Sequence, residues 1–185
     1  MLPSREVSMQ LLEEWVKNIN LRKHMFAVEA AMRAYAVIYG EDAEYWGQIG
    51  LLHDFDYEKY PTLENHPFKG AEELRKRGYP EDFVKTILAH APHTKEPRDT
   101  PVKKCIFAVD ELCGFLVAVT LVRPSKKFAE VSVESVKKKM KDKAFARQVN
   151  REEIIEGAKG LGLTLEEHIK NTLTALQKNA AILGL

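Results

Sequence analysis

Residues 105–119 read CIFAVDELCGFLVAV, an apolar run interrupted by acidic side chains. Asp110 follows Ile106 by four residues and precedes Cys113 by three and Val117 by seven, so on a helix it shares their apolar face. A buried carboxylate needs a cation or strong hydrogen-bond donors as its partner. The stretch therefore predicts a core helix that carries a functional aspartate.

Helices account for the rest of the pattern as well. Apolar residues recur at spacings of three and four along the chain, and period-two alternation is nearly absent, so we predict an all-α helical bundle. Capping and turn residues predict the helix boundaries. The expected helices run from Ser4 or Ser8 through Val16, Asn20 to Gly40, Asp42 to His53, Pro67 to Gly78, Pro80 to Pro92 and Pro101 to Val122, with later helices opening at Ser132, Asn150 and Thr164.

The chain has the length of one domain. We expect a single domain over residues 1–185, with its core at about residues 18–123 and a helical extension at about residues 124–185. The formal net charge of +1 gives no global attraction for nucleic acid, and the lysine-rich run at 126–143 is typical of a solvated helix face. We therefore expect no nucleic-acid partner.

Cysteine spacing and apolar runs indicate the cellular compartment of the protein. Cys105 and Cys113 are eight residues apart on one expected helix, too far to form a disulfide, so we expect reduced thiols. The most apolar run, 114–122, is too short to cross a bilayer, and the first residues lack the apolar stretch of a signal peptide. We predict a cytoplasmic protein without a membrane partner.

Three histidines share apolar helix faces in the way that Asp110 does. His24 lies in register with Val28, Ala31 and Tyr35, His53 with Trp46 and Ile49, and His90 with Phe83 and Ile87. A single inward histidine is more often a hydrogen-bonded core residue than a ligand. Four inward imidazole and carboxylate groups on four helices instead favour one shared transition-metal site, for Fe, Mn or Zn.

The pattern resembles the HD superfamily of metal-dependent phosphohydrolases, whose ligands are a helix histidine, a His-Asp doublet and a distal helix aspartate. The doublet ends an apolar helix in IGLLHDFDYEKYP. The resemblance is closer to a family of predicted hydrolases in that superfamily, through NHPFKGAEELRKRGYP, DELCGFLVAVTLVRP and GAKGLGLTLEEHI. It implies an HD-domain bundle with a metal site between core helices, built from His24, His53, Asp54 and Asp110.

Two further histidines match the extra ligands of binuclear HD enzymes. His66 and His90 would then hold a second ion, and Asp54 would bridge the two. We expect one or two divalent ions. His93, which follows Pro92, and His168 are not expected to be ligands.

The resemblance implies hydrolysis of a small phosphorylated substrate, such as a nucleotide, by metal-activated water, with Asp54 as the catalytic residue that orients the water or takes its proton. We expect the phosphate to be bound by basic residues of the loops, namely Lys59, Lys69, Arg98 and Arg123. Where many HD phosphohydrolases have a lysine three residues after the doublet, this chain has Tyr57.

Two alternatives remain open at this point. Some HD-superfamily members with the same six ligands are diiron oxygenases, and a non-catalytic module could keep the metal for structure or regulation. Ligand spacing describes the metal cage and not the molecule that enters it.

Overall fold

The structure is a computed structural model, and it describes residues 2–185. These residues form helices and connecting turns and no strand, so the all-α prediction is confirmed. The helices are α1 (Arg5–Trp15), α2 (Ile19–Tyr39), α3 (Ala43–Leu52), α4 (Phe68–Lys76), α5 (Glu81–Leu88), η1 (Pro92–Thr94), α6 (Pro101–Leu121), η2 (Phe128–Glu130), α7 (Val133–Lys141), α8 (Arg151–Gly160), α9 (Leu165–Lys178) and α10 (Ala180–Leu183).

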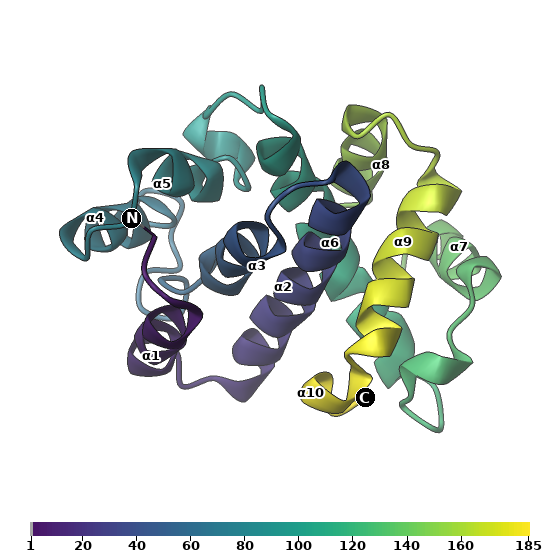
Figure 1. Ribbon diagram of the computed structural model, residues 1–185. Coiled ribbons are helices and arrows are strands. Elements are labelled where there is room, and N and C mark those ends of the chain that lie inside the picture. The colour runs from purple at the N-terminus through teal and green to yellow at the C-terminus, as the bar shows by residue number, and fades with distance from the viewer. Residues whose placement is uncertain (1) are drawn as a thin grey trace.

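Helix α2 crosses the middle of the molecule and contacts helices from both ends of the chain (Figure 1). It packs against α3, α6 and α9, while α8 packs on α6. Helices α1, α4 and α5 lie on the α3 side, and α7 lies on the α9 side. The two helices in the middle, α2 and α6, therefore lie between the early and the late parts of the chain.

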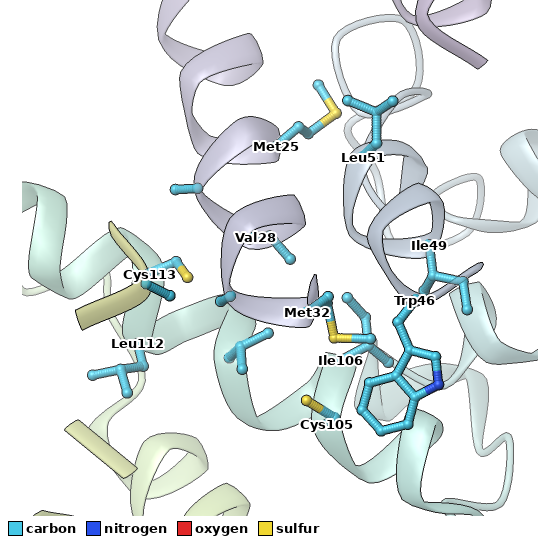
Figure 2. Packing of buried hydrophobic residues seen from close by; sticks show 14 of the residues in the cluster. Met25, Val28, Met32, Trp46, Ile49, Leu51, Cys105, Ile106, Leu112 and Cys113 are labelled. Carbon is cyan, nitrogen blue, oxygen red and sulfur yellow. The ribbon is translucent and has the colours of Figure 1, made fainter. Parts of the chain in front are cut away.

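The core forms where α2, α3 and α6 meet (Figure 2). Buried side chains that fill it include Met25, Val28, Met32, Trp46, Ile49, Leu51, Cys105 and Ile106. Gly50 lets α3 approach α2 closely, because a Cβ there would lie 2.8 Å from the carbonyl oxygen of Val28. Both cysteines are buried and unpaired, as the sequence predicted.

Most predicted helix boundaries are confirmed by the caps. Ser4, Asp42, Asn150 and Thr164 cap their helices through side-chain oxygens, and Gly40 ends α2 in the left-handed region at φ 71°. The prediction that Asn20 caps the second helix is wrong. Asn18 is the N-cap, because its side chain accepts hydrogen bonds from the backbone N–H groups of Asn20 and Leu21.

Other details differ from the sequence prediction. Pro67 and Pro80 are the N-caps of α4 and α5 and not their first helical residues, and α5 ends at Leu88, before the predicted end at Pro92. The short C-terminal helix α10 follows α9 directly and was not predicted. Within residues 2–185, no helix combines the length and apolar character that a membrane crossing needs.

Candidate metal centre

Six side chains from separate parts of the chain come together beside α2, α3 and α6. His24 lies on α2 and Asp110 on α6, while the doublet His53-Asp54 directly follows α3. His66 precedes α4, and His90 follows α5. All six of the metal ligands that the sequence and the resemblance predicted therefore meet in one place.

His53 and His90 are held in the same way, each just beyond the end of its helix. The Nδ1 atom of His53 lies 2.8 Å from the carbonyl oxygen of Gly50, and that of His90 lies 2.6 Å from the carbonyl oxygen of Ile87. Both carbonyls belong to the last turn of a helix, where such groups lack intrahelical donors. Because a carbonyl oxygen only accepts, both rings carry the proton on Nδ1, and Nε2 is left to face the centre.

Asp54 lies between two groups of imidazoles. Its Oδ1 is 3.3 Å from Nε2 of both His66 and His90. Its Oδ2 is 3.5 Å from Nε2 of His53 and 3.9 Å from Nε2 of His24. The two carboxylate oxygens thus face different sets of ligands, which is the arrangement that a bridging ligand requires.

Asp110 completes the first of these groups. Its Oδ1 lies 3.0 Å from Nε2 of His24 and 3.4 Å from Nε2 of His53. Within the described residues, ligand atoms of His24, His53 and Asp54 form one set close enough for an ion, and those of Asp54, His66 and His90 form another. We call the first set, together with Asp110, subsite 1. We call the second set subsite 2.

The donor set fits divalent metals, and the fit can be tested on single atoms. His53 Nε2 is buried and has no hydrogen-bond partner. Nε2 of His66 and Nε2 of His90 lie 3.2 Å apart. When both rings are neutral with the proton on Nδ1, these two atoms are acceptors that face each other, and a proton or a metal ion between them removes the repulsion. Imidazole together with carboxylate suits Zn, Fe or Mn.

The pKa values of the clustered side chains also indicate a site that attracts cations. Burial disfavours the charged form of Asp54, but the neighbouring His53, His66 and His90 outweigh this effect and hold its pKa well below the usual value. Burial alone would lower the pKa of His53, but Asp54 and Asp110 raise it to about 9. The carboxylates are therefore ionised at neutral pH and attract positive charge to this site.

The centre opens to solvent through a cavity of about 350 Å³. Its wall includes His24, Asp54, His66, His90 and Asp110, together with Tyr57, Ala91, Pro92, Glu111, Gly114 and Glu153. Glu111 and Glu153 are additional acids at this wall, and each accepts a hydrogen bond from Asn150. Burial, followed by the charge of Asp110, raises the pKa of Glu111 to about 7.

The four basic residues predicted to bind phosphate do not line this cavity. The ammonium of Lys59 lies 3.9 Å from the ring centre of Trp15, and Lys69 pairs with Glu72. Arg98 donates to the carbonyl oxygen of Ala89 and stacks on Phe107.

Arg123 lies beyond the C-terminal end of α6, several turns from Asp110. All four thus lie away from the cavity, and among the residues that the structure describes the cavity wall has no lysine or arginine.

The histidines that were not expected to be ligands stay outside the cluster of six. The Nε2 of His93 lies 2.8 Å from the carbonyl oxygen of His66. His168 is buried between the Tyr35 hydroxyl and the carbonyl oxygen of Ala108.

Sequence reasoning missed Asp56, which is completely buried and contacts His66, and it missed Glu111 and Glu153. The aspartate spacing in HDFD was the only available signal for Asp56.

Comparison with known proteins gives the family. The model of the HD domain matches residues 21–114, half of the chain, and this range contains all six clustered side chains. No curated protein and no solved structure matches the chain. HD domains bind divalent metals, in agreement with the two sets of ligand atoms described above. The chain belongs to the HD domain family.

Proposed function

We propose that this protein is a phosphohydrolase that binds two divalent ions and hydrolyses a small phosphorylated substrate, such as a nucleotide or another phosphate monoester. The observation that supports this most is the position of Asp54, whose two oxygens face two separate groups of imidazoles at 3.3–3.9 Å. HD domains are mostly metal-dependent phosphohydrolases, which supports the reaction class.

Bound ions would supply an activated water and would neutralise charge on the phosphoryl group. The chain supplies the remaining parts. Asp54 is ionised and lies at the cavity wall, so its carboxylate can orient the attacking water or accept its proton. His53 and His90, fixed by backbone carbonyls, keep their Nε2 atoms directed inward.

The cavity wall also restricts the substrate. It has two acids beyond the ligand set, Glu111 and Glu153, and no lysine or arginine among the described residues. A substrate phosphate would therefore depend on the ions for its binding, and additional phosphates would meet negative charge. This favours a monoester over a triphosphate.

The proposal is tested by loading the purified protein with Mn, Fe, Co or Zn and measuring phosphate release from a panel of phosphomonoesters and nucleotides. We expect turnover by at least one loaded form. Asp54→Asn should lower kcat/KM by about 100-fold or more. The matched control is Asp82→Asn, an exposed carboxylate outside the cavity, which should leave turnover unchanged. Absence of turnover with every metal would contradict the proposal.

Separate observations distinguish the other two functions. If the protein is a diiron oxygenase, anaerobic loading with iron followed by air gives a mixed-valent diiron signal and substrate-dependent oxygen uptake. A metal that serves structure alone would be fully enclosed by protein ligands. The open cavity beside Asp54 supports catalysis instead.

A further inference from the structure

Asp56 is a buried carboxylate outside the set of six. It lies in the loop after α3 with no exposed surface. Its Oδ1 is 2.8 Å from Nδ1 of His66, and its Oδ2 accepts a hydrogen bond of 2.7 Å from the backbone N–H of Gly70. An ionised carboxylate only accepts hydrogen bonds, so this pair places the imidazole proton of His66 on Nδ1.

The contact with Gly70 fixes the carboxylate in place. Gly70 is in the first turn of α4, and the N-cap of this helix, Pro67, makes no side-chain capping bond. Asp56 therefore serves as a remote cap for α4. Gly70 has to be small here, because a Cβ would lie 2.9 Å from Cγ of Asp56.

His66 needs this support more than the other inward histidines do. His53 and His90 give their Nδ1 protons to carbonyls of their own helix ends. His66 precedes its helix, and its Nδ1 meets the side chain of Asp56 instead. With the Nδ1 proton held there, Nε2 of His66 faces Asp54 at 3.3 Å and His90 at 3.2 Å.

We propose that Asp56 is a positioning residue for subsite 2: it fixes the tautomer and orientation of His66 and thereby determines the affinity of the ion held by Asp54, His66 and His90. The inference rests on the proposed two-ion centre. Outer partners that orient a ligating histidine typically change metal affinity by 10- to 100-fold when they are removed. A role limited to capping α4 would change stability and leave the affinity for metal unchanged.

Calorimetric titration of the metal-free protein with zinc tests this proposal. Asp56→Asn keeps one acceptor oxygen and replaces the other with an NH₂ donor, so its two side-chain atoms cannot accept from both His66 and Gly70. We expect subsite 2 to weaken by about 10- to 100-fold and subsite 1 to keep its affinity. Gly70→Ala, which keeps the carboxylate but displaces it, should weaken the same subsite.

The matched control is Asp42→Ala. Asp42 caps α3 by accepting from the N–H groups of Glu44 and Tyr45, and it contacts no imidazole. Its removal should lower the midpoint of urea unfolding and leave both subsites intact. This control separates loss of a helix cap from loss of ligand orientation.

A measurement on the wild-type protein avoids any variant that fails to fold. Nitrogen-15 NMR of the histidine rings in the zinc-loaded protein should find the His66 proton on Nδ1 and the metal on Nε2. The proposal is overturned if that proton lies on Nε2, or if folded Asp56→Asn binds both ions with wild-type affinity. If the wild type binds no zinc, the two-ion centre and this inference both fall. If the wild type and Asp56→Asn both bind zinc at two sites with equal affinities, only this inference falls.

Discussion

Two fully buried histidines, His53 and His168, show how side-chain partners separate a ligand from a core residue. His168 accepts from the Tyr35 hydroxyl through Nδ1, at 2.6 Å, and donates from Nε2 to the carbonyl oxygen of Ala108, at 2.8 Å. Both of its nitrogens are satisfied by protein. His53 has one nitrogen satisfied and the other, Nε2, without a partner. The unpartnered Nε2 of His53, which faces Asp54 and Asp110, fits a metal ligand, whereas His168 fits a core residue.

The environment of His168 predicts a pH dependence of stability. Burial lowers its pKa from the usual 6.5 to about 4, so between these values the unfolded chain binds a proton that the folded protein does not. The stabilisation is complete above pH 6.5 and is lost as the pH falls toward 4, by about 3 kcal/mol in total.

Urea unfolding of the metal-free protein between pH 4 and 7 measures this effect. The reference is His168→Gln, whose amide can still donate to Ala108 but does not titrate. Acidification should reduce the free energy of unfolding more for the wild type than for the variant, even though other groups titrate in both. Equal slopes for the two proteins would show that His168 has no role in the pH response.

At the level of helices, the centre depends on how closely α2 and α3 approach each other. Helix α2 carries His24, and α3 directly precedes the His53-Asp54 doublet. Gly50 of α3 lies where the two helices meet. Helix boundaries and inward faces were predictable from local signals such as the Ser4 cap, the Gly40 end and the apolar register of His24. The apolar faces that carry His24, His90 and Asp110 were enough to indicate that distant helices contribute to one site.

Other features depended on contacts that local patterns do not encode. Asp56 looks like an ordinary loop residue, because its role comes from partners ten and fourteen residues away. Glu153 looks like one of the acids that favour the first turn of a helix, and only packing of α8 on α6 brings it to the cavity. The basic residues were predicted from their charge and their expected position in loops, and none of them lines the cavity.

Gly50→Ala tests the close contact of α2 and α3. The added Cβ would lie 2.8 Å from backbone atoms of Val28 and Glu29, so the helices have to separate. Overpacking of this kind costs about 1–3 kcal/mol, and the better helix propensity of alanine offsets about 1 kcal/mol of it. We expect a lower free energy of unfolding and weaker binding of zinc at subsite 1.

The control for this substitution is Gly160→Ala in α8, where a Cβ would meet nothing within 4 Å. It should be neutral or slightly stabilising, and zinc binding should not change. If Gly50→Ala behaves like the control in both assays, the separation of α2 and α3 does not determine subsite 1.

On the scale of the whole molecule, the late helices take part in the candidate site. The family match ends at residue 114, yet Glu153 of α8 lines the cavity. Asn150, at the start of α8, joins the two acids: its backbone N–H bonds Glu111 and its side chain bonds Glu153. The segment at about residues 124–185, predicted as an extension of the core, therefore contributes to the wall of the site.

Removing the charge of Glu153 should improve activity on highly charged substrates. If two negative charges near 4 Å interact by about 1 kcal/mol, Glu153→Gln raises kcat/KM for a nucleoside triphosphate by about fivefold. The gain should be smaller for a monophosphate and should decrease at high salt. Glu152→Gln, an exposed acid on the same helix, provides the control. A gain that is equal for all substrates would exclude charge as its cause.

We propose that Asp54 bridges two ions, and metal analysis of proteins purified without added metal is the decisive experiment. We predict that Asp54→Ala loses all bound metal, because it contributes to both subsites, and that His90→Ala keeps about half of the wild-type content. Full metal content in folded His90→Ala would contradict the two-ion centre and leave a site for a single ion.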